Sequence, residues 1–195
     1  MALLDLADIS FGRGQRTLAE ALSLSIAPGT VVHLTGPNGA GKTTLLEIAA
    51  GLRRPWQGQR QCHTSLHWLG HRNALAASLS PLQNLESWAD LQVDITVSGR
   101  GALQALGVDR VRNRPCRDLS AGQKRRSALA RLVMAQRPLW ILDEPFDGLD
   151  QAGLADLADL FNAQTGRAGA ILVTSHQPLP ARIKSQCVLP LQVAP

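Results

Sequence analysis

Tyrosine is absent from this 195-residue sequence, and aromatic residues make up only 4% of it. Proteins that hold single-stranded nucleic acid stack its bases on aromatic rings, so this composition argues against such a platform. Cysteine is scarce as well, because Cys62, Cys116 and Cys187 are far apart and form no Cys-x-x-Cys pair. We therefore expect ordinary thiols in a reducing compartment and no disulfide scaffold.

Long apolar runs are also missing. The longest uncharged run, residues 21–41, is interrupted by glycines and prolines such as Pro28 and Pro37, so it falls short of the roughly 20 apolar residues of a membrane-spanning helix. The first residues carry acids where an export signal carries bases, and we expect no signal peptide. Hydrophobic residues make up 45% of the chain and charged residues 18%. This balance and the length predict a single globular domain over residues 1–195.

Positive charge is abundant and comes almost entirely from arginine. The chain has 20 basic and 15 acidic residues, and only three of the bases are lysine. Between Arg100 and Arg137 ten bases stand against two acids, which gives this segment a charge of +8. Such a segment could serve a nucleic acid or an anionic membrane. The alternative is that the arginines cover the surface of a helical region.

Segments typical of strands and helices alternate along most of the chain. The predicted strands are residues 3–9, 22–26, 31–35, 139–142 and 170–174, and the predicted helices are residues 45–51, 121–136 and 152–164. Alternation of this kind predicts a parallel sheet. The first two strands, with a glycine-rich turn at residues 11–14 between them, predict a small antiparallel element. We also predict a hairpin over residues 59–69, a helical subdomain at about residues 74–136, and a short C-terminal tail.

A complete phosphate-binding motif, Gly36-x-x-x-x-Gly41-Lys42-Thr43, lies between a predicted strand and a predicted helix. Glycines let successive backbone N–H groups and the helix N-terminus face one anion. Lys42 would add a positive charge between the β- and γ-phosphates, and the Thr43 hydroxyl would bind Mg²⁺. The predicted nucleotide-binding residues here are Gly36, Pro37, Asn38, Gly39, Ala40, Gly41, Lys42, Thr43 and Thr44.

Two adjacent carboxylates follow the apolar strand at residues 139–142. Asp143 is the candidate second metal ligand, beside Thr43. Glu144 can hold a water molecule for in-line attack on the γ-phosphorus, and a well-placed general base of this kind contributes about 10²- to 10⁴-fold in rate. The two motifs together predict a nucleotide-hydrolysing site.

The order of these motifs resembles that of ABC ATPases over nearly the whole chain. Leu119-Ser120-Ala121-Gly122-Gln123 is similar to the family's signature motif, Leu149-Asp150 to its D-loop, and His176 to its switch histidine. The resemblance implies an α/β P-loop NTPase with a RecA-like core, a small antiparallel β element and an α-helical signature lobe. It also implies ATP and Mg²⁺ as cofactors, and ATP hydrolysis as the activity.

The resemblance assigns roles to individual residues. Two ABC domains dimerise head to tail, so Ser120, Gly122 and Gln123 of one copy would contact the γ-phosphate held by the other. Asp150 would join this nucleotide site, and His176 would complete the catalytic group with Lys42 and Glu144. Phe11, which lies 25 residues before Gly36, would stack on the adenine.

Two positions depart from the family pattern. His71 occupies the place of the usual Q-loop glutamine, and Ala121 stands where glycine is more common. His71 could contact the metal and its water, although imidazole is a weaker ligand for Mg²⁺ than oxygen. It could instead face a partner subunit, or it could have only a structural role.

Several phrases resemble more narrowly the ATP-binding subunits of bacterial cytochrome c maturation exporters. These phrases are Leu69-Gly70-His71, Leu82-Gln83-Asn84-Leu85, residues 119–126, residues 140–146 and Thr174-Ser175-His176-Gln177. This implies a peripheral subunit at the cytoplasmic face of the inner membrane, bound to integral membrane subunits and driving haem export or delivery. The chain has no Cys-x-x-Cys-His motif, so direct haem binding is not expected.

Two alternatives remain at this point. The chain could serve another ABC importer or exporter, or it could be an ABC ATPase that acts on nucleic acid. Repair ATPases of the latter kind insert long coiled coils, and translation factors carry two cassettes. This chain has neither feature, so we expect no direct nucleic-acid partner.

Overall fold

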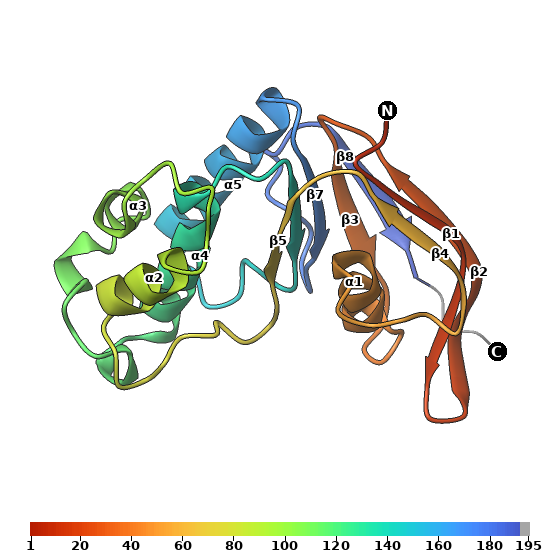
Figure 1. Cartoon of the computed structure of the whole chain (residues 1–195), viewed down its shortest axis with the longest axis horizontal. Helices are drawn as coiled ribbons and strands as arrows, with labels where there is room; N and C mark the ends of the chain where they lie inside the picture. The colour runs from red at the N-terminus through yellow and green to blue at the C-terminus, as the bar shows by residue number, and fades with distance from the viewer. Residues whose placement is uncertain (192–195) are drawn as a thin grey trace. The chain divides into compact units, whose positions relative to one another are not determined.

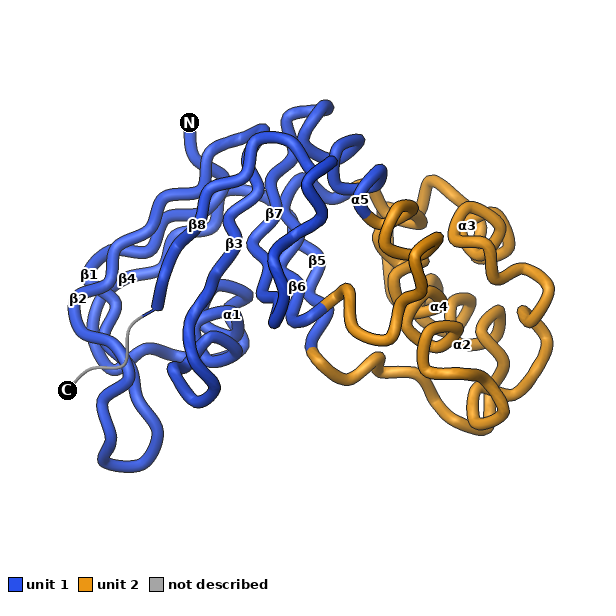
Figure 2. The backbone as a smooth tube through the Cα atoms, turned by 180° about the vertical axis from the view of Figure 1, so that it is seen from behind, with its two compact units in different colours: residues 1–70, 137–144, 158–195 blue, residues 71–136, 145–157 orange. Residues whose placement is uncertain are grey.

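The computed structural model describes residues 1–191. The chain divides into two compact units, and it enters each of them more than once (Figure 2). The first unit contains residues 1–70, 137–144 and the chain from residue 158 onward, and the second contains residues 71–136 and 145–157. The predicted domain extends to residue 195, and its last four residues lie outside the described part.

A five-stranded parallel sheet forms the centre of the first unit (Figure 1). Its strands are, in spatial order, β5 (Leu66–Leu69), β6 (Leu139–Leu142), β7 (Ala170–Thr174), β3 (Val31–Thr35) and β8 (Gln186–Pro190). Every residue of β6 and β7 is buried. Strands that are covered on both faces read as continuous apolar runs, which is why the sequence predicts their bounds well.

A three-stranded antiparallel sheet completes the first unit. β1 (Leu4–Arg13) lies between β2 (Arg16–Ile26) and β4 (Gln57–Cys62). Helix α1 (Lys42–Ala50) contacts β1 of this sheet and β6 and β7 of the parallel sheet. Its buried leucines, Leu45 and Leu46, belong to one hydrophobic core with residues of both sheets. This packing fixes the position of the loop that precedes α1.

The prediction of a hairpin over residues 59–69 is wrong. β4 pairs antiparallel with β1, whereas β5 pairs parallel with β6. Residues 63–65 therefore carry the chain from one sheet to the other. Local alternation indicates a strand but does not identify its partner, which the shared core determines.

Two other strand predictions need correction. The turn expected at residues 11–14 lies at Gly14 and Gln15, because β1 continues to Arg13 and β2 begins at Arg16. The expected C-terminal tail contains β8, which pairs parallel with β3. β8 is an edge strand with mostly exposed residues, so it shows no apolar pattern, and its terminal Pro190 is tolerated at such an edge.

The second unit contains three helices that pack against one another, namely α2 (Pro81–Ala89), α3 (Gly99–Ala105) and α4 (Ala121–Met134). Short 3₁₀ turns at Asp109–Val111 and Cys116–Asp118 connect α3 to α4. α4 ends two residues before the predicted end, because Ala135 is extended and bridges to Ile95. Helix α5 (Gln151–Gly166) begins in the second unit and ends in the first. Among residues 1–191, no helix combines the length and apolar character needed to cross a membrane.

Candidate functional site

The phosphate-binding loop joins β3 to α1 in a conformation that requires glycine. Gly36 and Gly41 have φ angles of 143° and 96°, in the region that residues with a side chain rarely adopt. A Cβ atom at Gly36 would lie 2.4 Å from the carbonyl oxygen of Leu191. Gly41 is the N-cap of α1, and it has no side chain that could accept hydrogen bonds from the first N–H groups of the helix. These groups are therefore available to an anion.

Lys42 is held over this loop. Its Nζ donates to the carbonyl oxygen of Gly36 over 2.8 Å and to that of Pro37 over 3.1 Å. An ammonium group has three donor hydrogens. Two of them bind the loop carbonyl oxygens, so the third can donate to an anion on the loop. The Lys42 ammonium thus lies at the loop, and its role as a phosphate ligand stays a prediction.

Thr43 and Asp143 provide a pair of oxygen ligands. The Oγ1 atom of Thr43 donates to Oδ2 of Asp143 over 2.9 Å, and Asp143 is only 3% exposed. Hydroxyl and carboxylate oxygens are the donors that Mg²⁺ prefers. The residues present therefore fit this ion.

Glu144 is buried and has an unusual backbone conformation. Its φ angle is +50°, and a non-glycine residue in this region is typically held by its surroundings at a functional site. Its carboxylate accepts the backbone N–H of His176 over 2.8 Å, and Nε2 of His176 lies 3.9 Å from Oε1. The structure therefore brings Glu144 and His176 together.

Thr174 is a site residue that the sequence reasoning missed. It is fully buried at the end of β7. Its hydroxyl donates to Oδ1 of Asp143 over 2.7 Å and accepts the backbone N–H of Glu144 over 2.9 Å. One side chain thus fixes both carboxylate residues. A polar residue at the carboxyl end of a buried parallel strand is the signal that could have found it.

We expect the substitution Thr174→Val to lower the rate of ATP hydrolysis about 10- to 100-fold, because it removes two hydrogen bonds at nearly constant volume. ATP affinity should change much less, since Lys42 and the loop are untouched. Steady-state hydrolysis and nucleotide binding measure the two effects. Thr174→Ser keeps the hydroxyl and should restore most of the rate, and a valine variant as active as the original protein would contradict this role.

Phe11 is covered in this structure. The residue is 1% exposed, and a Cβ atom at Gly41 would lie 2.9 Å from its Cε2 atom. Leu18 of β2 lies against the same glycine. Adenine could stack on this ring only after the ring had turned outward, so the adenine-stacking role of Phe11 stays a prediction.

The signature residues form the beginning of α4 in the second unit. The Oγ atom of Ser120 accepts the N–H of Gln123 over 3.2 Å, and the Gln123 side chain accepts the N–H of Ser120 over 3.0 Å. This capping box fixes the helix N-terminus, whose first turn contains no acidic residue. At Gly122, a Cβ atom would lie 2.6 Å from the carbonyl oxygen of Gly148. Glycine is therefore required there.

A pocket of about 710 Å³ adjoins this helix N-terminus. The signature residues and Asp150 line it together with Gly107, Val108, Arg110, Val111, Ala121, Arg126, Gly148 and Ala152. The helix dipole and Arg110 favour an anion in this space, whereas Arg126 is paired with the carboxylates of Asp150 and Asp156. His71, the first residue of the second unit, is exposed.

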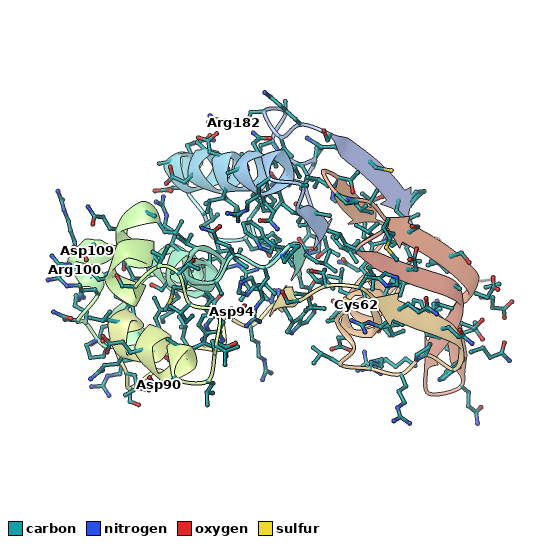
Figure 3. The ribbon with its side chains drawn as sticks, turned by 45° about the horizontal axis from the view of Figure 1, so that its top comes forward. Cys62, Asp90, Asp94, Arg100, Asp109 and Arg182 are labelled. Atoms are coloured by element: carbon teal, nitrogen blue, oxygen red, sulfur yellow. The ribbon has the colours of Figure 1, made fainter. Side chains whose placement is uncertain are left out.

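Several arginines of the basic segment serve the second unit itself. Arg125 is 3% exposed and donates to the carbonyl oxygen of Pro145 and to Asn73. Arg112 pairs with Asp109 over 2.9 Å, and Arg100 lies 3.8 Å from the same carboxylate (Figure 3). Much of the charge is therefore paired within the unit. This favours a role of the arginines in the helical region itself over a role in binding nucleic acid or an anionic membrane.

A phosphate-binding loop before α1, two carboxylates after β6 and a capped signature helix define an ATPase of the ABC type. The family model described as ABC transporter matches residues 19–147, and the chain belongs to this family. It is 44% identical to the cytochrome c biogenesis ATP-binding export protein CcmA of Gluconobacter oxydans over 91% of this chain and 83% of that protein. It is 40% identical to the protein of the same name from Hahella chejuensis, over 91% and 90% of the two chains.

Solved structures support the same fold. A dimeric ATP-binding cassette in a post-hydrolysis state, bound to ADP and Pi, superposes with a TM-score of 0.79 over 89% of this chain and 88% of that chain. Its sequence is 22% identical. The predicted α/β fold is thereby confirmed. The family model confirms the ABC ATPase class, and the CcmA relatives confirm the resemblance to cytochrome c biogenesis ATP-binding subunits.

Proposed function

We propose that this chain is the ATP-hydrolysing subunit of an export complex for cytochrome c biogenesis, peripheral to the cytoplasmic face of the bacterial inner membrane. The observation that carries the proposal is the 44% identity to a CcmA protein along most of both chains. The arrangement of the candidate nucleotide site supports it, because Lys42 lies over the phosphate loop, Asp143 binds Thr43 and Glu144 binds the backbone of His176. The cargo would be haem, exported or delivered to apocytochrome c, with no haem held by this subunit.

The residues of the first unit supply the chemistry. The loop N–H groups and Lys42 would bind the β- and γ-phosphates. Thr43 and Asp143 would hold Mg²⁺, which would neutralise charge on the phosphate oxygens. Glu144 accepts a proton from water as the water oxygen bonds to the γ-phosphorus, and the bond to the β–γ bridging oxygen breaks to give ADP and phosphate. The imidazole of His176 would donate a hydrogen bond to the γ-phosphate.

A second copy of the chain would complete the site. We propose that Ser120, Gly122 and Gln123 of one copy bind the γ-phosphate held by the other, with Asp150 near the same nucleotide. The capped N-terminus of α4 and its adjoining pocket support this role. One phosphate loop and one signature per chain make two copies the smallest active assembly, bound to integral membrane subunits.

Complementation tests the physiological role. In a bacterium that lacks its own CcmA, we expect this chain to restore covalent haem in c-type cytochromes, measured by haem staining of periplasmic proteins. The Glu144→Gln variant should fail to restore them, yet both forms should co-purify with the same integral membrane subunits. If other membrane proteins co-purify and cytochromes are not restored, the chain serves a different ABC transporter.

A further inference from the structure

The guanidinium of Arg126 occupies a slot in the second unit that the roles assigned above do not explain. Arg126 lies on α4, six residues after Ser120, and its side chain is 15% exposed. It forms an ion pair with Asp150 and another with Asp156, the latter over 3.2 Å. Its Nη1 atom also lies 3.4 Å from the carbonyl oxygen of Leu106. One cation is therefore shared by two carboxylates near the start of α5.

Two glycines leave room for this side chain. A Cβ atom at Gly153 would lie 2.9 Å from Nη2 of Arg126, and one at Gly107 would lie 3.3 Å from Nη1. The planar guanidinium presents its donors in a fixed fork, whereas a lysine ammonium is a compact point charge. The slot therefore fits arginine better than lysine.

Asp150 is the exposed residue that this cluster holds in place. Its side chain is 74% exposed, yet Oδ1 accepts the N–H of Gly153 over 2.9 Å in the manner of an N-cap for α5. The Gly153 N–H and the Arg126 side chain together hold the pKa of Asp150 below its usual range. The carboxylate is thus ionised at neutral pH and has a fixed direction.

The first turn of α4, which contains the signature residues, and the loop that ends at Asp150 are in contact at two points. Gly122 lies directly against the carbonyl oxygen of Gly148, and Arg126 binds Asp150 one turn further along α4. Arg126 and Asp150 line the same pocket as Ser120 and Gly122. The side chain of Arg126 is the charged link between these two parts of the pocket wall.

We propose that Arg126 is a positioning residue. It holds Asp150 in a fixed position relative to the first turn of α4, so that both bind a second copy of this chain together. The inference rests on the proposed function, because it requires the dimer. Without Arg126, Asp150 would lose its direction and the two parts would engage separately. Dimer formation and cooperativity of hydrolysis would then weaken, while nucleotide binding by Lys42 in the first unit would not change.

The variant Arg126→Lys, made alone and in the Glu144→Gln background, tests the proposal. We expect the dissociation constant of the ATP-bound dimer to be about tenfold higher for the double variant than for Glu144→Gln. Light scattering or sedimentation measures this constant. The Hill coefficient of hydrolysis in Arg126→Lys should fall toward one. Affinity of the monomer for a fluorescent ATP analogue should stay within about twofold.

Asp156→Asn is the matched control, because it removes the other carboxylate of the cluster and leaves Asp150 paired. We expect the dissociation constant of its dimer and its rate of ATP hydrolysis to stay within about twofold of the parent values. A purely structural role of Arg126 would lower the melting temperature without changing the Hill coefficient, and that result would overturn the proposal.

Two further outcomes separate the inference from the function. If Glu144→Gln alone forms no ATP-bound dimer, the proposed function fails. If Glu144→Gln with Arg126→Lys dimerises as well as Glu144→Gln, only the inference fails.

Should Arg126→Lys not fold, Asp150→Asn removes the ion pair while its carboxamide keeps the Gly153 bond. The same loss of dimer is then expected, and an unchanged dimer would overturn the proposal.

Discussion

Replacing Glu144 by glutamine should lower ATP hydrolysis about 10²- to 10⁴-fold, while ATP still binds and an ATP-bound dimer accumulates. The carboxamide oxygen of glutamine can still accept the backbone N–H that His176 donates to the glutamate. It cannot accept a proton from water at neutral pH. The substitution therefore removes the proposed base and leaves the surrounding geometry in place.

Phosphate release measures the rate, and light scattering measures the dimer in the presence of ATP and Mg²⁺. Glu86→Gln is a matched control, because Glu86 is exposed on α2 and the same atoms are exchanged there. The control should hydrolyse ATP at the parent rate. Undiminished hydrolysis by Glu144→Gln would show that Glu144 is not the general base.

Replacing Lys42 by alanine should weaken ATP binding roughly 10- to 100-fold and abolish measurable hydrolysis. A hydrogen bond from a charged group to a phosphate contributes about 1.5–3 kcal/mol, which sets this range. The substitution removes two exposed hydrogen bonds to the carbonyl oxygens of Gly36 and Pro37. The loop should still keep its conformation, because its positive φ angles are set by the glycines. The loss is thus expected in affinity and not in folding.

Equilibrium titration with a fluorescent ATP analogue measures the effect. Lys184→Ala removes an exposed lysine elsewhere in the first unit and should leave affinity unchanged. Thermal unfolding of both variants in the absence of nucleotide should match that of the parent protein. Unchanged affinity in Lys42→Ala would mean that the phosphates bind somewhere other than this loop.

The sequence predicts the centre of the fold well and its edges poorly. The bounds of β3, β6 and β7 match the predictions because those strands are buried on both faces, where composition and position agree. β8 has mostly exposed residues and ends in proline, so no local pattern marks it. The pairing of β4 with β1 depends on a core built from residues that are far apart in the sequence.

The candidate site follows a similar division. Motif spacing predicts Lys42, Thr43, Asp143 and Glu144, because phosphate and metal binding require those residue types in that order. Thr174 escapes prediction because a threonine at a strand end has many ordinary uses, and only the fold places its hydroxyl between two carboxylate residues. The burial of Phe11 likewise depends on the packing of β1 and β2 on α1.

The strand order of the parallel sheet has a consequence for synthesis of the chain. β3, which carries the phosphate loop, is made early, but both of its neighbours, β7 and β8, come from residues 170–190. Contacts between distant parts of a chain form only after both parts exist. The chain therefore has to be synthesised past residue 190 before β3 is flanked on both sides, and past residue 174 before Thr174 reaches Asp143. We therefore expect a chain that ends before β7 to lack both neighbours of β3 and the hydroxyl of Thr174, and to be degraded.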